Sequence, residues 1–112
     1  YIVMTQGGIA GIAAVAGELL WNYNRDRPYS DVVIPTPVYH DQHVYASVGS
    51  AGCDLIRLVK QDERSFDVTQ VYFSRNMKNE LGGFVLHNGH IYGSSSRRGW
   101  VCQTFSSGEL EW

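Results

Sequence analysis

The chain has 112 residues and a mass of 12.6 kDa, enough for one domain with a buried core and too few for two. Apolar residues make up 44% and charged residues 18% of the chain, which excludes an intrinsically disordered protein. The nine Lys and Arg are outnumbered by eleven Asp and Glu, and the pI is near 6.0, so no nucleic-acid partner is expected.

The composition favours β-structure. Twelve glycines, seven tyrosines and three tryptophans indicate strands and turns, because aromatic side chains pack well on a pleated surface. We therefore expect an all-β chain, organised as a single unit over residues 1–112.

The N-terminal segment partly resembles a secretory signal. The chain opens at Tyr1 without an initiator Met and carries no charge over its first 17 residues, so a processed or truncated N-terminus has to be considered. The apolar run Ile9–Ala16 has no basic segment before it, and polar residues and glycines interrupt the stretch that leads to it. It is also shorter than the roughly 18 to 20 apolar residues that span a bilayer. We expect neither a surviving signal peptide nor membrane insertion.

Apolar runs separated by turn residues predict three groups of strands. The first group is Tyr1–Gln6, Ile9–Val15 and Leu19–Trp21, with a turn at 16–18. The second is Thr36–His40, His43–Val48, Cys53–Lys60 and Phe66–Phe73, with the two-residue turn Asp41-Gln42. The third is Gly83–His87, His90–Ser94, Trp100–Phe105 and Leu110–Trp112, with turns at Asn88-Gly89 and 106–108. Asn-Gly between two apolar runs is a strong hairpin signal, because both residues accept the positive φ of a type I′ turn.

An α-helix over Gly8–Trp21 is the alternative for the first group. Its alanines and leucines favour a helix, whereas its three glycines and its β-branched residues lower helix propensity. Glycine and alanine also suit strands that are packed on both faces, since small side chains let neighbouring sheets approach closely.

The second and third groups are copies of one repeat. The segment Val38–Ser47 matches Val85–Ser94 without a gap at an offset of 47 residues. The match continues at the same offset, so that Gly52 falls on Gly99. Both copies therefore place the same types of residue along their strands.

The first group is a third, partial copy. Tyr1–Gly8 matches Tyr45–Gly52 at its ends with an offset of 44 residues. Gly17–Trp21 recurs as Gly108–Trp112 at an offset of 91, which is the sum of the two shorter offsets. A period near 45 residues is the spacing of one four-stranded β-propeller blade. The repeat thus predicts antiparallel four-stranded blades.

The Gly-Glu-Leu-x-Trp endings of the first and third groups resemble the tryptophan-docking repeat of the PQQ-like β-propeller family, where PQQ is pyrroloquinoline quinone. The resemblance spans nearly the whole chain. It implies that Gly17 and Gly108 form the tight turn between the last two strands of a blade. It also implies that Trp21 and Trp112 close the outer strand and dock onto the neighbouring blade.

The second group departs from this pattern. Residues 64–73 contain no Gly-x-x-x-Trp, so Tyr72 or Phe73 must substitute for the docking tryptophan. The remaining specific parts of the resemblance are Ile34–Val38 leading into Val44-Tyr45, and Gly82–Val85 leading into His90–Gly93.

The resemblance implies about two and three-quarter blades. They cover approximately residues 1–21, where the first strand is missing, 34–73 and 82–112. Closed propellers use about four to eight blades, so one face of each end blade is left uncovered. We expect the chain to be a fragment of a longer propeller, and the alternative is self-association through the exposed blade faces.

Two His-x-x-His pairs, His40 with His43 and His87 with His90, occupy equivalent positions. A two-residue hairpin turn places the members of each pair opposite one another on one face. Such a pair can chelate zinc or nickel, but two ligands do not complete a tetrahedral site. We therefore predict no metal site.

Cys53 and Cys102 are the two cysteines of the chain. The repeat alignment puts both on the same face of successive blades, which separates them beyond the Cα distance of about 7 Å that a disulfide allows. We predict two unpaired, mostly buried thiols.

The resemblance raises the question of quinone chemistry. PQQ-dependent alcohol and sugar dehydrogenases of this class hold the quinone on the propeller axis with calcium, a catalytic Asp and a disulfide of adjacent cysteines. The chain has no Cys-Cys pair. Nothing singles out a base among its aspartates, which are expected in or beside turns and linkers: Asp31, Asp41, Asp54, Asp62 and Asp67.

Other PQQ-like propellers bind no quinone and act as interaction scaffolds. We therefore expect a non-catalytic binding or interaction scaffold, with no catalytic residue and no cofactor in this segment. A fragment of a PQQ-dependent dehydrogenase is the alternative, in which a complete propeller binds PQQ with calcium. Because members of the family are commonly exported, the resemblance also implies a periplasmic or extracellular location.

Two surface segments complete the sequence predictions. Arg25, Asp26 and Arg27 are expected in a solvated charged linker. The loop that contains Arg97-Arg98 and its equivalent at Gly49–Gly52 are the expected contact surface for a protein or small-molecule partner, because loops at blade ends commonly bind.

Overall fold

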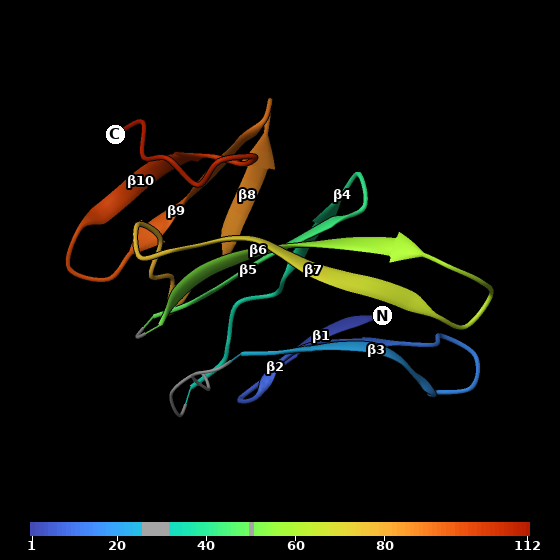
Figure 1. Ribbon diagram of the computed structural model, residues 1–112. Coiled ribbons are helices and arrows are strands. Elements are labelled where there is room, and N and C mark those ends of the chain that lie inside the picture. Colours follow the sequence, from blue (N-terminus) through green and yellow to red (C-terminus); the bar gives the residue numbers. More distant parts are fainter. Residues whose placement is uncertain (26–31, 50) are drawn as a thin grey trace.

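The computed structural model describes residues 1–25, 32–49 and 51–112 (Figure 1). This part of the chain consists of antiparallel β-sheets joined by turns, with no helix, which confirms the all-β prediction. The helix considered over Gly8–Trp21 is wrong, because those residues form two strands and a turn. Accordingly, the described residues include no helix long and apolar enough to span a membrane.

Within the described residues, ten strands form three sheets in chain order. The first sheet has the order β1-β2-β3, with β1 (Ile2–Thr5), β2 (Gly8–Ile12) and β3 (Leu19–Asn24). The second has the order β4-β5-β6-β7, with β4 (Val38–His40), β5 (His43–Val48), β6 (Gly52–Lys60) and β7 (Phe66–Ser74). The third pairs β8 (Phe84–His87), β9 (His90–Ser95) and β10 (Gly99–Thr104).

The hairpin turns agree with the prediction. Asp41 and Gln42 have φ angles of 43° and 61°, and Asn88 and Gly89 have 47° and 76°. Both residues of each turn are thus left-handed, as a type I′ turn requires. These turns fix the register of β4 on β5 and of β8 on β9.

The last predicted strand, Leu110–Trp112, is only partly formed. Leu110 makes an isolated bridge to Gln103, and Cys102 donates its amide to the Trp112 carbonyl at 2.9 Å. The segment therefore runs beside β10 without the continuous ladder of a strand.

One correction concerns the register of the first repeat. Ile2 pairs with Gly11, whereas Tyr45 pairs with Leu55, the counterpart of Gly11 at the offset of 44. The structural counterpart of Tyr45 is therefore Ile2, and the predicted match with Tyr1 is wrong by one residue. The cause is the shorter turn between β1 and β2, which the sequence match ignored.

The sheets lie in layers, with the second sheet between the other two (Figure 1). Side chains on alternate positions of its strands point to opposite faces, and both faces are buried. One core cluster, between the first and second sheets, is Ile9, Trp21, Val44, Ala46, Ile56 and Leu58. The other, between the second and third sheets, is Tyr45, Cys53, Leu55, Met77, Ile91, Val101 and Phe105.

Candidate functional site

The turns that precede Trp21 and Trp112 have the same backbone structure. The Gly17 amide donates to the Ala13 carbonyl at 3.0 Å, and the Gly108 amide donates to the Thr104 carbonyl at 2.9 Å. The two glycines have φ angles of 71° and 74°, a left-handed conformation in which a side chain is strained. Both turns thus require glycine at the position where the repeat places it.

The pairing beyond the turns is also shared. Gly11 pairs with Trp21 in the first sheet, and the corresponding Cys102 donates its amide to the carbonyl of Trp112. All of these equivalences use the offset of 91 residues that relates the two sequence motifs. The local geometry of the closing hairpin is therefore reproduced in two places.

The two tryptophans differ in their surroundings. Trp21 is 7% exposed and belongs to the core cluster between the first and second sheets. Its ring lies so close to Gly11 that a Cβ there would stand 2.1 Å from the indole Nε1. Trp112 is 63% exposed, and its ring contacts Tyr92 at a centroid distance of 6.3 Å.

Tyr72 occupies the outer strand of the second sheet and contacts the third sheet. Its hydroxyl donates to the Phe105 carbonyl at 2.9 Å, and its ring packs directly on Gly108. Burial raises the pKa of the Tyr72 hydroxyl well above its usual value, so it remains a donor. Phe73 faces the other way, with the Arg25 guanidinium 4.8 Å from its ring centroid. Of the two predicted substitutes, Tyr72 therefore makes the contact to the next sheet.

The histidine pairs lie as the hairpins predict. His40 is opposite His43 and His87 is opposite His90. The rings of His40 and His43 pack edge-on against Phe105, at centroid distances of 5.9 and 6.3 Å. One pair thereby takes part in contacts between the second and third sheets.

Two of these histidines form a hydrogen bond through Nδ1 with the backbone carbonyl two residues earlier in the chain. His43 Nδ1 lies 2.6 Å from the Asp41 carbonyl oxygen, and His90 Nδ1 lies 2.9 Å from that of Asn88. A carbonyl only accepts hydrogen bonds, so Nδ1 donates in both cases. His90 Nε2 is 3.9 Å from a Glu111 carboxylate oxygen. Across residues 1–25, 32–49 and 51–112, no three His, Cys, Asp or Glu side chains gather as metal ligands.

Both cysteines are free and buried, as predicted. Cys53 lies between the second and third sheets beside Gln103, which accepts a hydrogen bond of 2.8 Å from the Tyr45 hydroxyl. Burial raises the pKa of the Cys53 thiol, which disfavours the nucleophilic thiolate. Cys102 lies on the opposite side of the third sheet, where its hydrogen bond to Tyr92 raises the pKa of that tyrosine.

Asp54 and Arg25 are corrections to the sequence predictions. Asp54 lies within β6, not beside a turn, and its carboxylate is 3.1 Å from the Arg25 Nε. Tyr23 and Gln70 donate to the same carboxylate at 3.5 and 3.3 Å. The Arg25 side chain is 9% exposed and lies in an ion pair, so it is not a solvated linker residue. The counterpart of Asp54 in the third sheet is the buried Val101, a signal that this acid occupies a core position.

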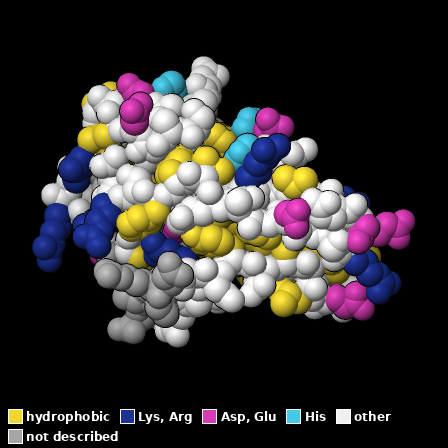
Figure 2. Space-filling view, in the orientation of Figure 1, with side chains coloured by type: hydrophobic (Ala, Val, Ile, Leu, Met, Phe, Trp, Pro, Cys, Tyr) yellow, Lys and Arg dark blue, Asp and Glu magenta, His cyan; other side chains and the backbone are white. Residues whose placement is uncertain are grey.

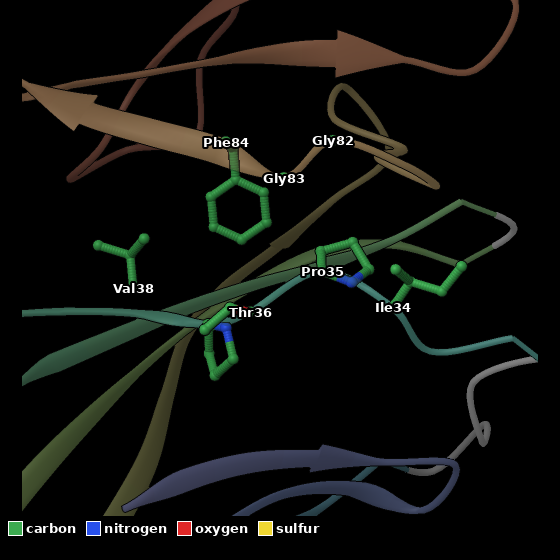
Figure 3. A pocket seen from close by; sticks show the side chains of 8 residues that line it. Ile34, Pro35, Thr36, Val38, Gly82, Gly83 and Phe84 are labelled. Carbon is green, nitrogen blue, oxygen red and sulfur yellow. The ribbon is translucent and has the colours of Figure 1, made fainter.

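A cleft of about 420 Å³ separates the segments that lead into β4 and β8. It is lined by residues 34–38 and 82–84 (Figure 3). The Phe84 ring projects from β8 toward the segment that carries Val38 and Pro35 (Figure 3). Gly82 and Gly83 have φ angles of 83° and 71°, and a Cβ at either would meet open space. The walls combine apolar rings with accessible backbone.

The linker between the second and third sheets is hydrogen-bonded to the segment that lines this cleft. Asn79 Nδ2 donates to the Gly83 carbonyl at 2.8 Å and to the Ser94 carbonyl at 2.9 Å. The backbone amide of Asn79 donates to the Ser47 hydroxyl at 3.0 Å. A buried side chain thus fixes the entry to β8 relative to both sheets.

The cleft opens at the same end of the sheets as the predicted contact loops. β4 and β8 begin at the end where β5 and β9 finish, because the strands are antiparallel. Arg97 and Arg98 are exposed there, and the Ser96 amide donates to the Lys78 carbonyl at 2.8 Å. Figure 2 shows Lys and Arg side chains gathered where β9 turns into β10. We call this end, with the cleft and these basic residues, the loop end.

Some predicted surface residues lie outside the described part of the chain. They are Asp26, Arg27, Asp31 and Ser50 of the loop at Gly49–Gly52. No protein-family model matches the chain, and no curated protein matches it either.

Proposed function

We propose that the chain is part of a PQQ-like β-propeller and acts as a non-catalytic binding scaffold. One observation supports this most: the Gly-Glu-Leu-x-Trp hairpin occurs twice, at an offset of 91 residues, with the same turn hydrogen bonds. Three antiparallel sheets of similar order, stacked face on face, are what successive blades look like. The missing inner strand of the first sheet fits a partial set of blades.

The number of sheets supports a larger assembly. Three sheets are described, whereas a closed ring needs about four to eight blades. We propose that the chain is a fragment of such a ring, in a protein that is periplasmic or extracellular like the family it resembles.

The scaffold role is supported by the loop end. There the cleft between Val38 and Phe84 offers apolar rings beside open backbone groups, and Arg97 and Arg98 add positive charge. Such a surface suits binding, because the cleft is lined by apolar side chains, one threonine and glycine backbone, and by no His, Cys, Asp, Glu or Lys. We propose that a protein or small-molecule partner binds at this end and that the segment carries no cofactor.

One experiment distinguishes a scaffold role from dehydrogenase activity. The coding DNA on both sides of the chain is sequenced, and the whole encoded protein is purified and titrated with PQQ and Ca²⁺. A scaffold predicts further units of about 45 residues, no quinone absorbance band and no dye-linked alcohol or sugar oxidation. Saturable, calcium-dependent quinone uptake with such oxidation would establish the dehydrogenase instead. Flanking sequence without such units would contradict the proposal that the chain is a fragment of a longer propeller.

A further inference from the structure

Positively charged side chains gather at the loop end. Arg97 and Arg98 lie in the turn between β9 and β10, and both are exposed. The linker that follows β7 is fixed to this turn, because the Ser96 backbone amide donates to the Lys78 carbonyl at 2.8 Å. Arg75, at the start of the same linker, is exposed as well. The two segments thus bring four cationic side chains to one end of the sheets.

The charge of these side chains is not neutralised by their surroundings. Within residues 1–25, 32–49 and 51–112, none of the four lies in an ion pair. Two acids lie near this end among the same residues. Asp54 is buried and paired with Arg25, and the exposed Glu80 packs against Gly49. The described surface of the loop end is therefore mostly positive.

The connections at the opposite end of the sheets are acidic. Five of their residues carry a carboxylate: Glu18, Asp41, Asp62, Glu63 and Glu109. Lys60 and Arg64 lie beside two of them and offset only part of this charge. Figure 2 shows Lys and Arg side chains gathered at the loop end and most Asp and Glu side chains away from it. The formal net charge of -2 therefore conceals two ends of opposite sign.

The cleft of about 420 Å³ lies beside the cations of the loop end. Asn79 follows Lys78 in the linker and donates from Nδ2 to the carbonyl of Gly83, which lines the cleft. Ile34, also in the lining, and Leu81, just before it in the chain, are 51% and 68% exposed. The loop end thus combines exposed apolar side chains with unpaired positive charge.

Further sheets would not cover this surface. The three sheets stack through their faces, with the two core clusters between them, whereas the loop end is formed by connections at the ends of strands. A sheet stacked on the free side of the first or the third sheet would therefore leave the loop end open.

We propose that the loop end binds an extended acidic segment of another protein. An apolar side chain of that segment occupies the cleft beside Phe84, and its carboxylates face Arg97, Arg98 and Lys78. Carboxylates complement guanidinium groups that have no partner of their own, and the apolar side chain leaves water for the cleft. This inference rests on the proposed scaffold role and specifies the chemistry of the partner.

The spread of the contacts favours a peptide segment over a small anion. The cleft and the cations belong to three separate parts of the chain, at 34–38, 75–84 and 95–98. A single small anion reaches only some of these groups. An extended chain with apolar and acidic side chains contacts all three parts at once.

Selection from a phage-displayed library of random peptides tests the partner chemistry, with the protein at its encoded length as the target. The proposal predicts that the enriched peptides carry net negative charge and at least one aromatic or large aliphatic side chain. Enrichment of neutral or basic peptides would overturn it, and so would a selection that enriches none.

Charge reversal at the two ends gives matched variants, measured by fluorescence polarisation of the selected peptides. Arg97→Glu with Arg98→Glu should weaken binding about tenfold or more, because two attractive contacts become repulsive. Lys60→Glu with Arg64→Glu reverses two exposed cations at the opposite end and should leave the affinity unchanged. Thr36→Trp, at an exposed position in the cleft lining, should fill the cleft and weaken binding about tenfold. Circular dichroism shows that each variant is folded.

Equal affinities in the two charge-reversed variants would overturn the proposal, as would unchanged binding in Thr36→Trp. Vesicles of phosphatidylglycerol and a thymidine oligonucleotide are titrated in parallel. If either binds as tightly as the selected peptides, the loop end is a general anion surface and the assignment to a protein segment is wrong. Any of these failures leaves the quinone titration, and with it the scaffold role, unaffected. Quinone uptake in that titration would instead overturn the scaffold role and leave the measured peptide affinities as they are.

Discussion

The hairpins that end in Trp21 and Trp112 share their turn, pairing and glycine conformation, yet one tryptophan is 7% exposed and the other 63%. The shared part is local, because it depends on a left-handed glycine and on residues close in sequence. The different part depends on a neighbouring sheet, which covers Trp21 and is absent at Trp112. A repeat motif therefore fixes the hairpin, whereas burial depends on what stacks beside it.

The largest expected effect comes from truncating the buried member of the pair. Trp21→Ala should lower the free energy of unfolding by about 3–5 kcal/mol, because it removes a core aromatic ring and leaves a cavity. Trp112→Ala should cost less than about 1 kcal/mol in the monomer, since the ring is mostly exposed. Urea unfolding of both variants at a concentration where the chain is monomeric measures the difference. Equal losses would show that the two environments are alike.

The turn glycines sharpen the same comparison at a smaller scale. Gly17→Ala should cost about 1–2 kcal/mol, because alanine is strained at this φ while its Cβ meets open space. Gly108→Ala carries the same strain and also places a Cβ 2.6 Å from the Tyr72 ring, so it should cost about 1–3 kcal/mol more. Urea unfolding compares them, and a smaller loss at Gly108 would contradict the packing of Tyr72 on this turn.

Alkaline pH should weaken the contact between the second and third sheets. Burial raises the pKa of Tyr45 and of Tyr72 above the value of about 10 that each has in the unfolded chain. The folded state therefore holds these protons more tightly, and its stability is full below pH 10 and falls as pH rises toward the folded values. The slope is up to about 1.4 kcal/mol per pH unit for each group.

Urea unfolding between pH 7 and 11 measures this slope. Tyr45→Phe should make this slope smaller, because one of the two tyrosines no longer titrates. It should also lower stability at pH 7 by about 1 kcal/mol, because the hydrogen bond to Gln103 is lost. Tyr39→Phe, at an exposed tyrosine, is the matched control and should leave the slope unchanged. A slope that persists unaltered in Tyr45→Phe would assign the effect to other groups.

Trp112→Ala, which should change stability least, should also change the reactivity of one thiol. Cys102 is buried beside Tyr92 and Trp112, so Trp112→Ala should increase its rate of reaction with an aromatic disulfide reagent about tenfold. Cys53, buried between two sheets, should react no faster in the same variant. Mass spectrometry of labelled peptides distinguishes the two thiols. Equal acceleration of both would point to general unfolding.

Most of the fold was predictable because its signals are local. The turns at Asp41-Gln42 and Asn88-Gly89, the apolar run of β5 and the glycines at 17 and 108 each act over a few residues. The strands consequently appear within a few residues of their predicted bounds. The exceptions are Leu110–Trp112, which makes one bridge, and the register of β1, which a shorter turn shifts by one residue.

The contacts that join the sheets were harder to predict from the sequence than the strands and turns were. The pair of Asp54 with Arg25 links residues far apart in the chain, and no periodicity places them together. The choice of Tyr72 over Phe73 depends on the bulge in the pairing of β6 with β7, which sets the side chain's direction. The cleft between residues 34–38 and 82–84 also forms only when two sheets stack.

Acrylamide quenching of single-tryptophan variants tests the stacking of sheets most directly. One variant keeps Trp21 and replaces Trp100 and Trp112 by Phe, and the other keeps Trp112 and replaces Trp21 and Trp100. At concentrations where both are monomeric, the account predicts blue-shifted, protected emission from Trp21 and red-shifted, readily quenched emission from Trp112. Equal quenching of the two would show that no sheet covers Trp21 and would contradict the stacked arrangement.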